Sequence, residues 1–146
     1  MNARMTMVEN AYFSKYGKEF QEKIFQCFLN DHRWAAQMEE VMTYEYFELR
    51  YLRYLCQRLF DYHGKYKTFP TLSLLVSIIR DELKEGNDII LRDQIIDYLQ
   101  RVKINPHPGD LGYVKDKALD FCKKQAIKAA LEEAVTLIAS EHYEPI

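Results

Sequence analysis

Hydrophobic residues recur at helical spacing along most of the chain, and this pattern predicts an all-α protein. Apolar positions lie three and four residues apart in six segments, and no segment alternates long enough to predict a strand. The six segments are 18–29, 32–42, 47–63, 71–85, 88–103 and 113–138. Residues that cap or end helices, such as Asp31, Thr71 and Gly86, lie at the junctions. We therefore expect a compact cluster of about four helices followed by a C-terminal antiparallel helical hairpin.

The last predicted helix carries apolar residues on two opposite faces. At about 100° per residue, Val114, Ala118 and Phe121 share one face in its first half. In its second half the apolar residues fall on the opposite face: Ile127, Ala130, Leu131, Ala134, Leu137 and Ile138. A single core would have to bury the lysines between these faces, which is costly. We therefore expect one face to pack on the helix's own domain and the other against the hairpin mate and a second subunit.

The preceding segment, 88–103, also has a wide apolar stripe, which suits a helix with neighbours on two sides. The link between the two helices, residues 105–110, reads Asn-Pro-His-Pro-Gly-Asp and is rich in helix-stopping residues, which predicts an antiparallel hairpin. We divide the chain into a flexible N-terminal arm (1–16), a globular helical head (17–87) and an oligomerisation hairpin (88–140). The residues predicted for subunit pairing are Tyr98, Leu119, Ala126, Ala130, Ala134 and Leu137.

Length and composition fit this picture. With 146 residues, of which 48% are hydrophobic, the chain is large enough for one domain with a core. A net charge of -2 argues against a protein whose main task is to bind nucleic acid phosphates. No run of about 18 apolar residues exists, and residues 1–10 lack the apolar centre of a signal peptide. We expect an intracellular protein without a membrane span, in which Cys27, Cys56 and Cys122 are reduced, buried thiols.

The sequence contains no motif for catalysis. Gly17-Lys18 and Gly64-Lys65 lack both the upstream glycine and the hydroxyl residue of a phosphate-binding loop. The histidines are scattered and form no zinc-binding helix. Asp93 and Asp97 lie one turn apart, but without a third ligand we interpret them as a solvated polar strip. We therefore expect no catalytic, cofactor-binding or metal-binding residue in this chain.

One stretch interleaves cations with aromatic rings, an arrangement that can bind nucleic acid by pairing with phosphates and stacking on bases. Its charged members Arg50, Arg53, Lys65 and Lys67 are candidate contacts for a partner protein or for DNA. Helical spacing separates many of the rings from the guanidinium groups, and the chain as a whole is slightly acidic. We therefore favour a protein-docking or solvated face over direct contact with DNA.

Three motifs occur in an informative order. Residues 28–34 read Phe-Leu-Asn-Asp-His-Arg-Trp, residues 66–71 read Tyr-Lys-Thr-Phe-Pro-Thr, and residues 113–117 read Tyr-Val-Lys-Asp-Lys before an alanine-rich run. In this order they resemble the N-terminal domain of DnaB-type replicative helicases, in the divergent form carried by bacteriophages. The chain departs from that pattern at Asp93-Gln94, where a glycine pair is usual, and at Pro106 and Pro108 in the turn.

The resemblance implies a function. In that family the N-terminal domain is a helical head with a hairpin that pairs between subunits. Six copies form a collar, a trimer of dimers, which docks primase and in some systems a helicase loader. This chain would then not be an enzyme itself, and ATP and magnesium would bind an ATPase domain expected after residue 146, in the cytoplasm of a bacterium or of a phage-infected host cell. Two alternatives stay open: a stand-alone helical adaptor or regulatory module, and a small DNA-binding helical protein.

Overall fold

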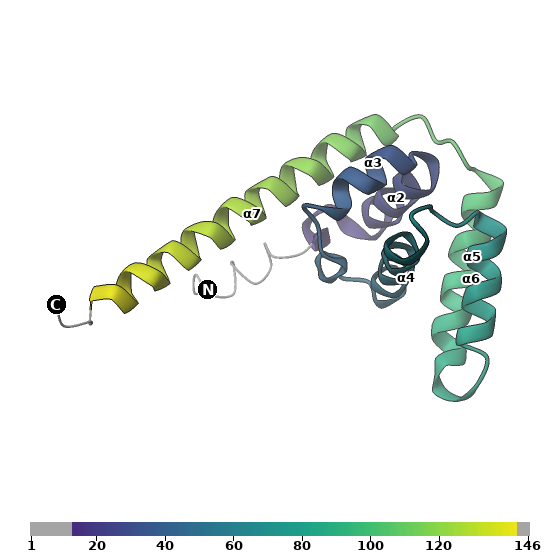
Figure 1. Ribbon diagram of the computed structural model, residues 1–146. Coiled ribbons are helices and arrows are strands. Elements are labelled where there is room, and N and C mark those ends of the chain that lie inside the picture. The colour runs from purple at the N-terminus through teal and green to yellow at the C-terminus, as the bar shows by residue number, and fades with distance from the viewer. Residues whose placement is uncertain (1–12, 143–146) are drawn as a thin grey trace.

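The computed structural model describes residues 13–142, which fold into helices joined by short connections (Figure 1). The elements are η1 (Phe13–Tyr16), α2 (Gly17–Asn30), α3 (His32–Glu39), η2 (Tyr44–Tyr46), α4 (Arg50–Tyr66), α5 (Leu72–Glu82), η3 (Gly86–Asp88), α6 (Ile89–Ile104) and α7 (Leu111–His142). The described residues contain no strand, so the predicted all-α fold is confirmed. The six predicted segments correspond in order to α2 through α7.

Local side-chain chemistry accounts for several helix ends. The carboxylate of Asp31 accepts a hydrogen bond from the backbone N–H of Trp34 at the start of α3, at 3.0 Å. The hydroxyl of Thr71 accepts one at the start of α5. Helix α4 runs through Gly64, where the sequence predicted its end, and stops at Lys67, whose φ of 60° lies in the left-handed region. A left-handed residue other than glycine thus ends this helix.

Helix α2 lies at the centre of the fold, where it packs against α3, α4, α7 and η1. Because neighbours cover it on most sides, even its polar residues Gln21 and Gln26 are buried. Both are hydrogen-bonded: Gln21 accepts from the backbone N–H of Glu48 at 2.9 Å, and Gln26 donates to the backbone carbonyl of Asn105 at 2.6 Å. The core around α2 also holds the three cysteines as buried free thiols, as predicted.

The short helix η1 belongs to the core. Phe13 is fully buried, and its ring lies against those of Tyr46, Phe47 and Phe121. The predicted flexible arm (1–16) is therefore wrong for residues 13–16, and residues 1–12 lie outside the described residues. A single buried aromatic ring produces no periodic pattern, so periodicity did not reveal this contact.

Helices α6 and α7 do not form the predicted antiparallel hairpin. Helix α6 packs against α4 and α5, whereas α7 leaves in another direction and packs against α2 (Figure 1). The linker between them, residues 105–110, is held on the surface of α2. The side-chain amides of Gln26 and Asn30 donate to backbone carbonyls of the linker at 2.6 and 2.5 Å, and Lys23 forms an ion pair with Asp110. Because α2 holds the linker in this way, α7 starts along α2 and does not fold back on α6.

The centre of the core is aromatic. The fully buried ring of Phe28 lies 5.3 to 6.5 Å, centroid to centroid, from four other rings. These rings belong to Phe25, Trp34, Phe47 and Phe60. Trp34 of α3 stacks on Phe28. One phenylalanine of α2 therefore joins α2, α3 and α4.

Replacing Phe28 with alanine should remove this junction. We expect Phe28→Ala to lower the free energy of unfolding by about 3 to 5 kcal/mol, since it loses buried area and leaves a cavity. The measurement is urea unfolding followed by circular dichroism. Tyr66→Ala, which truncates an exposed ring, serves as the control and should cost less than about 1 kcal/mol. Equal losses in the two variants would contradict the central role of Phe28.

Candidate interaction surface

The second half of α7 projects beyond the rest of the protein (Figure 1). Phe121 and Cys122 are the last residues of α7 that are buried in the core. Residues 123–140 are exposed or half-buried along their whole length. At about 1.5 Å per residue, the part of α7 beyond Cys122 extends roughly 30 Å from the core. It is the longest segment of the described chain that leaves the core.

Large hydrophobic side chains are exposed on this projecting segment. Each has 55% to 67% of its area exposed: Ile127, Leu131, Val135, Leu137 and Ile138. Ile127, Leu131, Ala134 and Ile138 are spaced four, three and four residues apart, so they form one row along the helix. We call this row, with Val135 and Leu137 at its borders, the distal stripe. A contiguous apolar surface of this kind marks an interaction site more often than a solvated face.

The distal stripe lies on the side of α7 opposite to the residues that the core buries. The buried row contains Val114, Ala118, Phe121 and Cys122. Where this row would continue along the helix, the sequence has the polar residues Gln125, Glu132 and Thr136. The predicted change of apolar face along the helix is therefore confirmed. Since α6 does not pack beside it, no element of the described chain covers the distal stripe.

Most residues predicted for subunit pairing are accessible on this segment. The exposed ones are Ala126, Ala130, Ala134 and Leu137. Leu119 is half-buried and packs against the core, so only its exposed edge could contact a second subunit. The predicted pairing set left out Ile127, Leu131 and Ile138, which form the centre of the row. Their four, three, four spacing is the signal that identifies them.

Tyr98, the remaining predicted pairing residue, is buried inside its own subunit. Its side chain is 2% exposed, and its hydroxyl donates a hydrogen bond to the backbone carbonyl of Glu22. The ring packs against Phe25 of α2 and Tyr51 of α4. The prediction that Tyr98 pairs subunits is therefore wrong. An apolar row predicts that a side chain is buried, but it does not tell which neighbour buries it.

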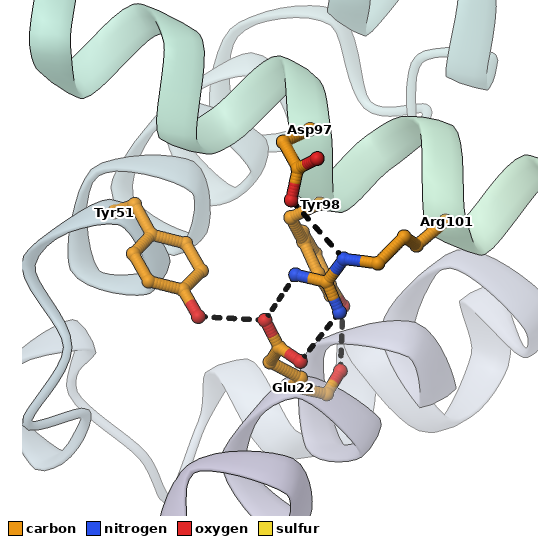
Figure 2. Close-up of polar contacts among 5 residues, drawn as sticks. All are labelled: Glu22, Tyr51, Asp97, Tyr98 and Arg101. Carbon is orange, nitrogen blue, oxygen red and sulfur yellow. Dashed lines mark hydrogen bonds and ion pairs between the residues drawn. The ribbon is translucent and has the colours of Figure 1, made fainter.

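Beside Tyr98, a polar network joins α6 to α2 and α4 (Figure 2). The guanidinium of Arg101 donates two hydrogen bonds to the carboxylate of Glu22, at 2.8 and 2.9 Å, and a third to Asp97 at 3.2 Å. The hydroxyl of Tyr51 donates to the same carboxylate of Glu22 at 2.6 Å. The polar groups of this network bind one another, so we assign the network a structural role.

The network also changes the acidity of Glu22. Burial acts to raise the pKa of this carboxyl, but hydrogen bonds from Arg101 and Tyr51, together with the positive charge of Arg101, outweigh burial and hold the pKa below its usual value. Glu22 is therefore ionised in the folded protein at neutral pH, and its ion pair with Arg101 stabilises the contact between α2 and α6.

The four candidate cations for a partner or DNA face do not form one patch. Arg50 and Arg53 lie in the first turn of α4, whereas Lys65 and Lys67 lie at its other end, roughly 20 Å away. Arg53 donates to the backbone carbonyl of Phe47, and Lys67 donates to that of Gly64 at 2.9 Å. The structure thus does not bring these residues together.

No protein-family model, curated protein or solved structure matches this chain. Among residues 13–142, no three histidine, cysteine or acidic side chains are grouped as metal ligands would be. No helix in that same range has the length and apolar character needed to cross a bilayer. Function is therefore inferred from the fold and from its exposed surfaces.

The Glu22 network makes stability depend on pH. Because the folded pKa of Glu22 is lowered, the stability it contributes is fully present above the unfolded value of 4.5 and is lost as pH falls through the folded pKa. We expect Arg101→Met to lower the free energy of unfolding by about 2 kcal/mol at neutral pH, since a mostly buried carboxylate loses its main partner while Arg101 itself is half exposed. Urea unfolding at neutral pH and near pH 3 measures both effects.

The difference between wild type and Arg101→Met should shrink at the lower pH, because the stability that ionised Glu22 contributes is lost as pH falls from 4.5 through its folded pKa. Arg92→Met, which removes an arginine that pairs with the exposed Asp93, is the control and should cost less than about 1 kcal/mol at either pH. A loss in Arg101→Met that is the same at both pH values would contradict the role given to the ionised carboxylate.

Proposed function

We propose that this chain is a non-catalytic assembly domain, the collar domain of a DnaB-type hexameric replicative helicase. In this proposal the distal stripe pairs with that of a second copy, and the outer surface docks primase or a helicase loader. The observation that carries the proposal is the uncovered row on the projecting half of α7. The order of sequence motifs given above supports the choice of family. On this proposal, the domain works in the cytoplasm, and ATP and magnesium bind a separate motor domain.

The energetics of burial support pairing. Fully burying a large aliphatic side chain contributes about 1.5 to 3 kcal/mol, and the five large residues on or beside the distal stripe keep more than half of their area exposed. Two copies would together gain on the order of 10 kcal/mol, which is comparable with the roughly 4 to 15 kcal/mol that association costs in lost freedom of motion. Pairing through this surface is therefore feasible, and contacts elsewhere would strengthen it.

Symmetry also supports pairing with a second copy. A two-fold axis that crosses the stripe near Leu131 and Ala134 would pack the stripe of one copy against the same stripe of the other. Because both copies then use the same surface, the assembly closes at a dimer. The charges favour the antiparallel arrangement of the two helices. Lys123 and Lys124 lie at the near end of each stripe, so an antiparallel pair keeps the lysines of the two copies at opposite ends, whereas a parallel pair would bring them together.

A stand-alone adaptor would use the same surface, so the choice between collar and adaptor rests on the partner. The other alternative, a small DNA-binding helical protein, is less well supported because the four candidate cations are divided between the two ends of α4. We therefore keep the collar as the proposed function and test pairing and partner binding separately.

Pairing is tested by a charge placed in the distal stripe. We expect Ala134→Glu to keep the helical circular dichroism spectrum and to weaken dimerisation by about tenfold or more, since it brings two like charges into an apolar contact. Analytical ultracentrifugation or light scattering over a range of concentrations measures the mass. Ala129→Glu makes the same change on the other side of α7 and is the matched control. The pairing surface would be disproved if both variants kept the wild-type mass.

Partner binding distinguishes the collar from the adaptor. The probe is the helicase-binding domain of the primase encoded in the same genome, titrated into this chain by calorimetry. We expect binding to wild type and to Ala129→Glu, and weaker binding to Ala134→Glu, because a paired domain offers a composite surface. No binding to a protein that does dimerise would reject the primase-docking collar while leaving the pairing surface intact.

A further inference from the structure

A groove runs between α5 and α6 on a face of the protein that α7 does not touch. One part of it has a volume of about 340 Å³ and an adjoining part about 560 Å³, and the two share Arg80, Ile96 and Gln100. The floor of the first part is apolar, since it is formed by Leu72, Val76, Ile96 and Leu99. Such a groove between two helices has the shape that a third helix fits.

The charges at the rim of the groove are unbalanced. Arg80 and Lys103 are exposed at this rim, and within the described residues neither side chain has a hydrogen-bond or ion-pair partner. The two carboxylates of the adjoining part are already engaged, Asp93 by Arg92 at 3.1 Å and Asp97 by Arg101 at 3.2 Å. Two cations beside an apolar floor are thus left for a ligand of opposite charge.

We propose that this groove binds an amphipathic helix of another protein, whose apolar face is bordered by aspartate or glutamate. The apolar face would cover Leu72, Val76 and Ile96, and the carboxylates would pair with Arg80 and Lys103. The lining runs from residue 92 to residue 103 of α6, about 16 Å, so the bound helix needs roughly three turns. This proposal does not depend on whether α7 pairs.

The charges argue against two other occupants. The distal stripe of a second copy is apolar, but Lys123, Lys124 and Lys128 lie on or near its borders, and these would meet Arg80 and Lys103 with the same sign. Nucleic acid is disfavoured because its phosphates would pair with the rim cations but leave the apolar floor without a partner. An amphipathic helix with acidic borders would bury the apolar floor and pair with the cations at the rim.

The test uses two labelled helical peptides of about 12 residues, or three turns. Both have leucines three and four residues apart. One has glutamates beside the leucines and the other has lysines at the same positions. Fluorescence anisotropy measures their binding to the full chain and to the double variant Arg80→Glu, Lys103→Glu. All proteins also carry Ala134→Glu, so that the distal stripe offers a poor site to either peptide.

We expect the acidic peptide to bind the protein with the native groove at least about tenfold more tightly than the basic one, and this order to reverse with the double variant. A double variant with the same change of charge elsewhere, Lys18→Glu with Arg33→Glu, should leave the preference intact within about twofold. Three results would each overturn the proposal: equal binding of both peptides, no effect of the groove variant, or an equal effect of the control variant.

Discussion

The contact between one face of α2 and the linker, residues 105–110, determines the shape of the molecule. Lys23, Gln26 and Asn30 are spaced three and four residues apart, so they point from α2 toward the linker together. Directly after Asn30, Asp31 binds Lys115 of α7 at 2.8 Å while it caps α3. Fixed at both places, α7 must run along α2 and then leave the core. The exposure of the distal stripe follows from this contact.

The sequence predicts the helices well because each one buries a periodic apolar row, which is a property of a single segment. The change of apolar face within α7 was predicted for the same reason. The hairpin was predicted wrongly, because the contacts that prevent it join α2 to residues 76 to 87 positions away and are mostly hydrogen bonds to backbone carbonyls. A hydrophobic pattern contains no information about such bonds.

The same difference, between a property of one segment and a contact between distant segments, applies to the candidate sites. The distal stripe was predictable, since its residues share one helix face and the lysines opposite the buried row exclude a single core. Tyr98 was assigned to the wrong neighbour because burial inside one subunit and burial between two subunits leave the same pattern in a sequence. The groove between α5 and α6 could not be predicted. It exists only because two helices lie beside each other, and the two cations at its rim have no ion-pair partner among the described residues.

The lack of tertiary contacts along the projecting part of α7 has a consequence for how this part folds. An isolated helix of about 20 residues is only marginally stable in water, even when it is as rich in alanine as this one. Its hydrogen-bonded backbone therefore gains most of its stability when another apolar surface covers the stripe. On the proposed pairing, folding and binding would be thermodynamically linked there: dilution would lower the local helical content, and amide hydrogens would exchange faster beyond Cys122 than before it.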